Sequence, residues 1–258
     1  MSISSSVLAI ASQRMPRFSS RFLASSGYTL NPSSIGDESA FSVWHRSTAE
    51  RQDRAWQPIV AAAKGGHPRE DVAALYDAIG SLPGLPRTLL EVGCGGGYNS
   101  ELICSRFPSI EYTGVDISTA MIEIAHEHYP SRTFSVGSAY ELDFARRSFD
   151  VVVDGVALLH MQGWRNALAE YARVASSFVV LHGLTLTDAA PTTEFAKYAY
   201  GQPALELVFN RDELLAECGA VGLSLVSTEG GLDYDLKRYI GIESVSETWV
   251  MAPAGPPH

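Results

Sequence analysis

A glycine-rich turn carries the strongest chemical signal in the sequence. Residues 91–97 read EVGCGGG and directly follow an apolar run. Glycines let the backbone turn sharply and leave room for a ligand against the main chain. A helix after the turn would aim its first N–H groups at that ligand. Asp116 lies about 20 residues beyond Gly93, a spacing at which a carboxylate can accept hydrogen bonds from ribose hydroxyls. The pattern predicts a nucleotide-like ligand.

The turn differs from two common phosphate-binding motifs. A dinucleotide fingerprint needs a third glycine, but Tyr98 stands at that place when the motif is counted from Gly93, and Ser100 when it is counted from Gly95. A P-loop needs a Lys followed by Ser or Thr after its glycines, and none is present. An NAD-dependent oxidoreductase is therefore the less favoured interpretation.

Two histidines are candidate general bases. His160 follows an apolar run at 149–153 and His182 ends another at 177–181. Strand ends of this kind face the ligand crevice of an open α/β sheet. Each histidine has an alternative role as a packed side chain with a hydrogen bond to the protein. His126 and His128 are two residues apart on an expected helix and face apart, so we expect no metal site there.

The elements that position these residues follow from apolar runs alternating with helical periodicity. The sequence predicts strands at 88–92, 111–115, 133–136, 149–153, 177–181, 223–226 and 248–251, and helices at 99–107, 119–128, 164–175 and 210–218. Such alternation predicts a doubly wound α/β fold. We expect a mostly parallel, seven-stranded, Rossmann-like sheet with helices on both faces and an N-terminal helical cap.

One domain is expected from residue 37 to residue 258. It divides into a helical cap at 37–87, a cofactor-binding core at 88–182, a substrate-side insertion at 183–209, and a C-terminal helix and strands at 210–258. The insertion is rich in aromatic residues, and Trp56, Tyr198 and Tyr200 are candidates for the wall of an apolar acceptor pocket.

Residues 1–36 have a different composition. They are rich in Ser, contain three Arg and hold no acidic residue. This composition predicts a disordered tail; an organelle transit peptide has a similar composition. We therefore expect a cytoplasmic protein, with a mitochondrial location as the alternative.

Net charge and length exclude several classes of protein. The 258 residues carry a formal charge of −10. An acidic chain lacks the basic face of a duplex nucleic-acid binder. No apolar run approaches the ~20 residues that cross a bilayer. Three cysteines are too few and too scattered for a disulfide framework.

Four segments in order resemble the motifs of a known family. They are LEVGCGGG at 90–97, GVDIS at 114–118 followed by Met121, GSA at 137–139, and SFDVVV at 148–153 followed by LLH at 158–160. From about residue 88 to residue 181 the chain resembles the class I S-adenosylmethionine-dependent methyltransferases. The resemblance implies S-adenosylmethionine as cofactor.

The resemblance also implies roles at the methionine end of the cofactor. Glu91 would hold the amino group, directly or through water, and Gly93 and Gly95 would let the backbone approach it. Gly155 and Val156 would border the sulfonium and the path to the acceptor.

At the nucleoside end, Asp116 would bind both ribose hydroxyls and Ile117 would pack on the adenine. Ser138 and Ala139 would meet the edge of the adenine. The family often has Asp where this chain has Ser138, so a charged acceptor is replaced by a hydroxyl.

The implied activity is transfer of a methyl group to a small molecule by in-line displacement, for which the protein mainly supplies alignment. Two alternatives remain open: a non-catalytic module that binds S-adenosylmethionine, and a protein methyltransferase. The oligomeric state stays open as well.

Overall fold

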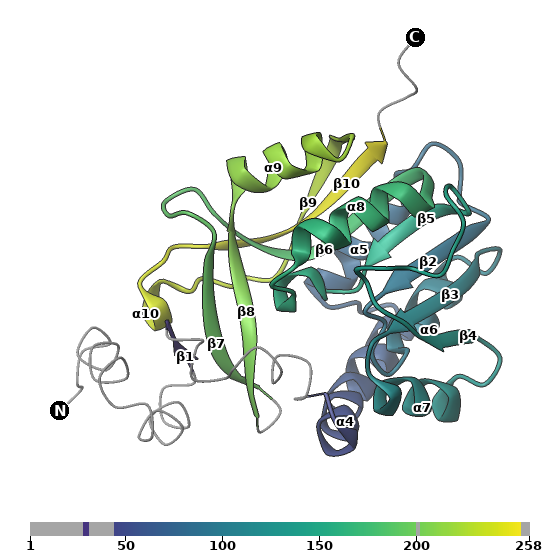
Figure 1. Ribbon diagram of the computed structural model, residues 1–258. Helices are drawn as coiled ribbons and strands as arrows, with labels where there is room; N and C mark the ends of the chain where they lie inside the picture. Colours follow the sequence, from purple (N-terminus) through teal and green to yellow (C-terminus); the bar gives the residue numbers. More distant parts are fainter. Residues whose placement is uncertain (1–27, 31–43, 200–201, 254–258) are drawn as a thin grey trace, which may run out of the picture.

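The computed structural model describes residues 28–30, 44–199 and 202–253 (Figure 1). Its core is a sheet of seven strands in the order β4-β3-β2-β5-β6-β10-β9. These strands are β2 (Thr88–Val92), β3 (Glu111–Asp116), β4 (Thr133–Val136), β5 (Phe149–Asp154), β6 (Ala175–Thr187), β9 (Leu223–Gly230) and β10 (Val245–Pro253). Strands β2 to β6 pair in parallel, and β10 runs antiparallel to both β6 and β9. The predicted mostly parallel sheet is confirmed, and the seven predicted strands form its core, but the sheet of the described residues has ten strands in all.

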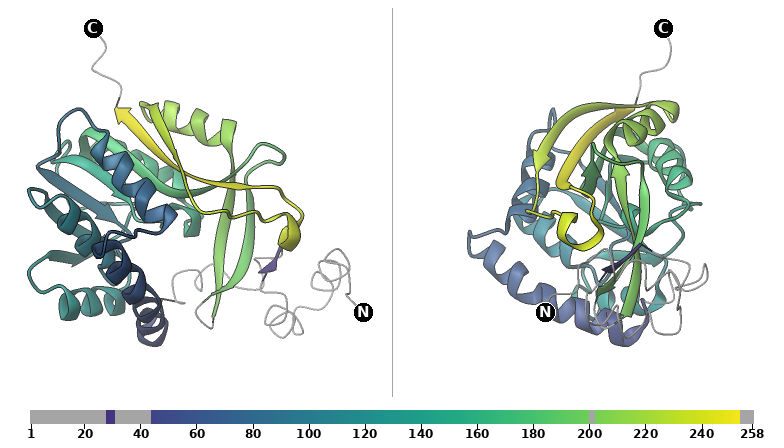
Figure 2. Two further views of the ribbon diagram at one scale, coloured as in Figure 1. Left: turned by 180° about the vertical axis from the view of Figure 1, so that it is seen from behind. Right: turned by 90° about the vertical axis from the view of Figure 1, so that its left-hand side faces the viewer.

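Helices cover both faces of this sheet (Figures 1 and 2). They are α4 (Arg46–Lys64), α5 (Glu70–Gly80), α6 (Tyr98–Arg106), α7 (Thr119–His128), α8 (Trp164–Val174), α9 (Arg211–Ala220) and the short α10 (Lys237–Ile240). The strand β2 shows how the two cores arise: Leu89 packs with residues of α5, α6 and α7, whereas Leu90 packs with residues of α8 and α9. Successive side chains of a strand point to opposite faces, and parallel strands buried on both faces are continuously apolar.

The predicted helix starts and ends agree closely with the structure. Asn210, which precedes α9, accepts a hydrogen bond from the Glu213 N–H at 3.1 Å. Ser118 in the same way accepts from the Met121 N–H at 3.2 Å at the start of α7. Both are N-cap contacts that satisfy an otherwise unpaired helix donor.

Three further strands extend the sheet beyond the core. Strands β7 (Thr193–Ala199) and β8 (Gln202–Asn210) form an antiparallel hairpin, and the end of β8 pairs in parallel with the end of β6. The expected insertion at 183–209 is thus the continuation of β6 through Thr187 and then this hairpin. The sheet grows at the same edge because β6 is much longer than the other core strands.

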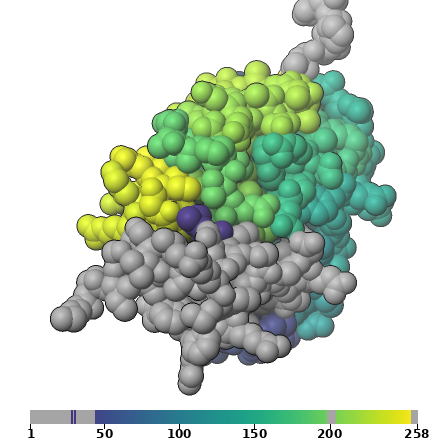
Figure 3. Space-filling model, turned by 60° about the vertical axis from the view of Figure 1, so that its left-hand side comes forward, coloured from purple at the N-terminus to yellow at the C-terminus, as the bar shows by residue number. Residues whose placement is uncertain are grey.

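The outermost strand, β1 (Tyr28–Thr29), comes from the N-terminal segment and pairs with β7. Figure 3 shows β1 between the β7–β8 hairpin and the C-terminal segment that carries α10. Residues 28–30 fall within the segment predicted as a disordered tail, and they are ordered here: Tyr28 stacks on Tyr239 with ring centroids 4.2 Å apart. Residues 1–27 and 31–36 lie outside the described residues.

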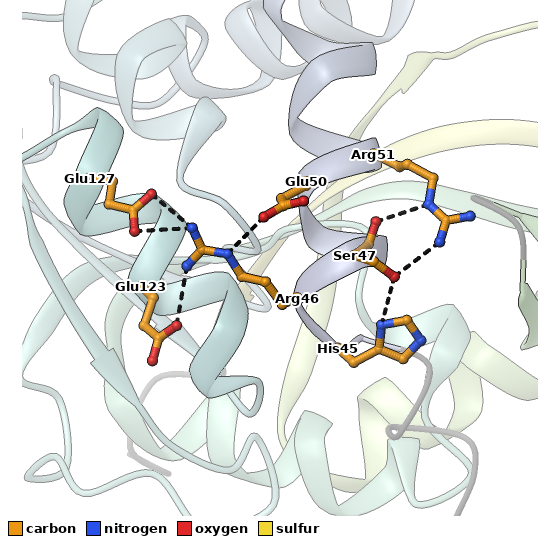
Figure 4. A network of polar contacts seen from close by, with 7 residues as sticks. All are labelled: His45, Arg46, Ser47, Glu50, Arg51, Glu123 and Glu127. Atoms are coloured by element: carbon orange, nitrogen blue, oxygen red, sulfur yellow. Dashed lines mark hydrogen bonds and ion pairs between the residues drawn. The ribbon is translucent and has the colours of Figure 1, made fainter.

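The helix α4 is held on α7 by a network around Arg46 (Figure 4). The Arg46 guanidinium contacts Glu50 at 3.0 Å, Glu123 at 3.2 Å and Glu127 at 3.1 Å. These side chains are about half exposed, and exposed ion pairs typically contribute less than about 1 kcal/mol each. The network therefore sets where the cap helix lies more than it stabilises the fold.

Within the described residues, no helix is long and apolar enough to cross a membrane.

Candidate active site

A cavity of about 490 Å³ opens where the core strands end at their carboxyl termini. The strands β2, β3 and β5 contribute lining residues from their last positions or from the loops that follow, and β6 contributes His182, Gly183 and Thr185 from within the strand. The open edge of an α/β sheet at its carboxyl end is the usual place for a ligand. The structure describes eleven of the thirteen site residues expected from the sequence in full; the other two are Tyr198 and Tyr200.

The glycine turn between β2 and α6 forms one wall. Gly93 and Gly95 line the cavity and have positive φ angles of 73° and 52°, a conformation that costs glycine little. A Cβ on Gly93 would lie 2.1 Å from the Cβ of Ala157. The glycines therefore allow the loops after β2 and β5 to approach each other.

Asp116 ends β3 and lines the cavity beside this turn. Its carboxylate accepts hydrogen bonds from the Gly95 N–H at 2.9 Å and the Ser118 N–H at 2.8 Å. Desolvation raises the pKa of Asp116, while these two N–H groups oppose the rise. An ionised carboxylate has about four acceptor positions, so two remain for a ligand.

Glu91 lies beneath the cavity rather than in its wall. The side chain is buried, and its carboxylate accepts from the Asn99 amide at 2.7 Å and from the Tyr112 hydroxyl. Burial raises the pKa of Glu91 to about 7. A Cβ on Gly155 would lie 2.3 Å from Glu91 Oε1, so Gly155 keeps the floor of the cavity thin above this carboxylate.

Three expected residues of the nucleoside end line the cavity together. Ile117 is 43% exposed, although isoleucine side chains are most often buried. It lines the cavity, where its apolar surface suits packing against a flat ring. Ser138 and Ala139 line the adjoining wall, and Ser138 Oγ accepts from the Tyr140 N–H at 3.2 Å.

Gln52 brings a polar atom without a partner to the glycine turn. It projects from α4 into the cavity, and its Oε1 would lie 3.2 Å from a Cβ on Gly95. Within the described part of the chain, this oxygen is buried and makes no hydrogen bond. A buried acceptor without a donor is costly, so Gln52 Oε1 fits a ligand that donates a hydrogen bond.

His160 lies at the end of η2 (Leu158–His160), a short 3-10 turn that follows β5. Its Nδ1 is 2.6 Å from the Leu205 carbonyl oxygen, which can only accept a hydrogen bond. Nδ1 therefore carries the proton, and Nε2 of the neutral ring keeps its lone pair. Desolvation lowers the pKa of His160, which favours the neutral ring.

Asp154 fixes the turn that carries His160, a role that sequence reasoning missed. Its carboxylate accepts from the Leu158 N–H at 3.0 Å and from the Tyr171 hydroxyl at 3.0 Å. Val156, next to this turn, has a φ of 63°, a strained value for a β-branched residue, and lines the cavity. The sequence did hold one indication of this role, because Asp154 directly follows the strand predicted at 149–153.

His182 lines the cavity from the middle of β6. Its Nδ1 lies 2.8 Å from the Thr248 hydroxyl on β10, and burial lowers its pKa to about 4. A hydroxyl can donate or accept, so this contact leaves either ring nitrogen able to carry the proton.

Of the expected acceptor residues, Trp56 lines the cavity and stacks on Tyr98 with centroids 4.0 Å apart. The Arg69 guanidinium lies 4.7 Å from the centre of the Trp56 ring. Tyr200 lies outside the described residues, and the structure describes only the backbone of Tyr198.

The β7–β8 hairpin contributes a polar group that the sequence did not indicate. Lys197 and Glu206 line the cavity together with Tyr234, which precedes α10. Nowhere in residues 28–30, 44–199 and 202–253 do three His, Cys, Asp or Glu side chains gather as a metal site.

Comparison with known proteins identifies the core. Residues 89–177 match the family described as a methyltransferase domain. Over 89 residues the chain is 34% identical to the demethylmenaquinone methyltransferase of Thermotoga maritima, covering 34% of this chain and 39% of that protein. Over 114 residues it is 33% identical to the O-methyltransferase rstn1 of Aspergillus nomiae, covering 41% of this chain and 50% of that protein. The chain thus spans half or less of the length of these relatives.

A solved structure extends the likeness in fold beyond this region. The 1,6-didemethyltoxoflavin-N1-methyltransferase of Burkholderia thailandensis, solved with S-adenosylhomocysteine, superposes with a TM-score of 0.53 over 81% of this chain and 89% of its own, at 15% identity. The matched residues contain the glycine turn, Asp116, Ser138 and Gly155. Residues 89–177 thus match the methyltransferase domain family in sequence, and the chain shares its fold with this solved methyltransferase.

Proposed function

We propose that the protein transfers the methyl group of S-adenosylmethionine to a hydroxyl group of a small molecule. The observation that carries this proposal is the cavity itself, which joins a glycine turn and a ribose-type carboxylate to a histidine whose Nε2 is free to accept a proton. The activity of the whole chain is proposed because its relatives match over only part of their length.

The residues present fit S-adenosylmethionine. Asp116 has acceptor positions left for the two ribose hydroxyls, and Ile117 offers an exposed apolar face for the adenine. Gln52 Oε1, a buried acceptor without a donor, lies against the turn where the resemblance places the methionine ammonium. Glu91 lies beneath Gly155 at the same end, where a ligand ammonium would favour the ionised form of its carboxylate.

S-adenosylmethionine supplies a methyl group already activated on a positive sulfur. The protein therefore has two tasks: it holds the acceptor oxygen in line, and it removes the hydroxyl proton as that oxygen attacks. His160 is placed for the second task, because the Leu205 carbonyl fixes the proton on Nδ1 and leaves Nε2 as the base. A positioned base typically contributes about 10²–10⁴ in rate.

His182 is the other candidate base from the sequence, and it also lines the cavity. The structure favours His160, because a carbonyl defines its tautomer whereas the Thr248 hydroxyl leaves that of His182 open.

The test is incubation of the full chain with methyl-labelled S-adenosylmethionine and a panel of small hydroxylated, amino and thiol compounds. We expect S-adenosylhomocysteine together with a methyl ether of one of the hydroxylated compounds, in which the labelled methyl group replaces the hydroxyl proton. Asp116→Ala serves as the control for dependence on the cofactor site. Cofactor binding without turnover on any compound would favour a non-catalytic module, and label on a protein side chain would favour a protein methyltransferase.

A further inference from the structure

Three polar side chains meet in the part of the cavity built by the β7–β8 hairpin. The Lys197 ammonium donates to the Tyr234 hydroxyl at 3.0 Å, and that hydroxyl donates to Glu206 Oε2 at 3.1 Å. Lys197 Nζ also lies 3.5 Å from Glu206 Oε1. All three residues line the cavity, and we call them the acceptor cluster.

The charges in the acceptor cluster are partly removed from water. The Glu206 side chain is 8% exposed and that of Lys197 is 29% exposed. Removing such charges from water is costly, and a buried ion pair is weak evidence for added stability. The cluster therefore calls for a role beyond holding β7 to β8, which backbone pairing already does.

The acceptor cluster still has hydrogen-bonding capacity. An ammonium has three N–H groups. Among the described residues, the hydrogen-bond and ion-pair partners of Lys197 are Tyr234 and Glu206, and the centre of the Tyr28 ring lies 6.0 Å from its Nζ. A carboxylate accepts at about four positions, and Glu206 uses two of them. Together they can donate to and accept from the same ligand oxygen.

The opposite charges of Lys197 and Glu206 cancel. An anionic ligand would be attracted by the ammonium and repelled by the carboxylate, and a cation would meet the reverse. Both would lose solvation without net compensation. An uncharged hydroxyl group, which donates and accepts at once, matches the pair.

The same strand links the acceptor cluster to the proposed base. Leu205, whose carbonyl fixes His160, directly precedes Glu206 in β8. An acceptor held at Glu206 is thus held relative to His160 Nε2. Trp44, whose ring centre is 5.4 Å from that of His160, lines the cavity as an aromatic wall.

We propose that Lys197, Glu206 and Tyr234 select an uncharged acceptor with at least two hydroxyl groups, one bound at the cluster and the other methylated beside His160. The proposal rests on the proposed function for the second hydroxyl. The first hydroxyl is tested by binding alone.

The test uses three ring compounds that differ in one group: 3-hydroxybenzyl alcohol, 3-hydroxybenzoate and 3-hydroxybenzylamine. Their affinities for the full chain, saturated with S-adenosylhomocysteine, are measured by ligand-observed NMR titration. We expect the wild-type protein to bind the alcohol about tenfold more tightly than either charged compound, because each of those meets one like charge in the cavity.

Two substitutions should then reverse the preference. Glu206→Gln leaves the Lys197 charge uncompensated, so the benzoate should become the preferred ligand. Lys197→Met leaves the Glu206 charge uncompensated, so the amine should become the preferred ligand. The exposed pair Lys237–Glu243, at 2.9 Å, lies outside the cavity lining, and Glu243→Gln and Lys237→Met repeat the same changes in charge as controls.

A role confined to holding the hairpin would lower the melting temperature of both cluster variants without changing the order of the three affinities, and that result overturns the proposal. So does wild-type protein that fails to bind the alcohol or that binds a charged compound as tightly. Failure of the proposed function looks different: the affinities follow the expected order, but no methyl group is transferred to the alcohol.

Discussion

The two halves of the cavity are built in different ways. The half assigned to the cofactor is made by the ends of β2, β3 and β5 and by turns that follow them directly, with backbone N–H groups and glycines as its main parts. The other half is made by side chains from β6, β7, β8 and the segment before α10, which are far apart in the chain. Binding in the cofactor half depends on backbone geometry. Binding in the other half, which we call the hairpin half, depends on the charges and protonation states of its side chains.

Because of this difference, the two halves tolerate substitutions to different degrees. A backbone cradle tolerates few changes, because a Cβ at Gly93 or Gly155 would collide with neighbouring atoms. The hairpin half can change its side chains without disturbing the seven-stranded core, because β7 and β8 lie at the edge of that sheet. We expect substitutions in one half to leave the binding measured in the other half nearly unchanged.

The largest expected effect lies where the two halves meet, because His160 is on the turn after β5 and its Nδ1 contacts the Leu205 carbonyl of β8. His160→Gln removes the proposed base, so the single-turnover rate with a hydroxyl acceptor should fall by about 10²–10⁴. The affinity for S-adenosylhomocysteine should stay within about twofold, because substitutions that share no partners with the cofactor site affect its binding little. His182→Gln is the matched variant. Wild-type rates in His160→Gln would show that the base lies elsewhere.

Asp116→Ala tests the cofactor half. Hydrogen bonds to charged groups contribute about 1.5–3 kcal/mol each, so calorimetry should show at least about a tenfold loss of affinity for S-adenosylhomocysteine. Asp143→Ala, at an exposed position, is the control. If Asp116→Ala bound as tightly as the wild type, the ribose would have another partner.

The pH dependence of stability should report His182. Its pKa is about 4 in the folded protein, against an ordinary value of 6.5, because burial disfavours the charged ring. The unfolded chain then binds more protons between these values. The contribution is therefore complete above pH 6.5 and is lost as the pH falls toward 4, with a slope of up to about 1.4 kcal/mol per pH unit.

Urea unfolding of the wild-type protein and His182→Gln from pH 7.5 to pH 4 measures this difference. The nearby charges of Asp71 and Arg69 are present in both proteins, as are Glu91 and Asp154, whose raised pKa values act in the opposite sense. We expect the wild type to lose stability more steeply on acidification. Parallel curves would mean that His182 is not held neutral by burial.

The smallest effect is expected at Gln52. Gln52→Leu should weaken binding of S-adenosylhomocysteine by about tenfold, the lower end of the range for one hydrogen bond to a charged group. Binding of 5′-methylthioadenosine, which lacks the amino-acid end, should not change. Gln57→Leu on the exposed side of α4 is the control. Equal loss for both ligands would place Gln52 at the nucleoside end instead.

Local pattern was sufficient to predict the core. Strands such as 88–92 are short apolar runs that end in glycine, and helix ends such as Asn210 carry capping residues. Gly93, Gly95 and Asp116 belong to one βαβ unit, so their proximity follows from the order of the elements.

The hairpin half was not predictable in the same way. The sequence predicts the stretch 183–209 only as a substrate-side insertion, because the pairing of β7 with Tyr28–Thr29 is a long-range contact that no local period encodes. Lys197, Glu206 and Tyr234 have no characteristic spacing, and only the folded sheet brings them together.

Calorimetric titration of the full chain with S-adenosylhomocysteine, and separately with NADH, tests the central claim most directly. We predict binding of S-adenosylhomocysteine at one site together with a higher melting temperature, since a ligand that binds only the folded state stabilises it. NADH should do neither. Binding of NADH without any response to S-adenosylhomocysteine would contradict the account.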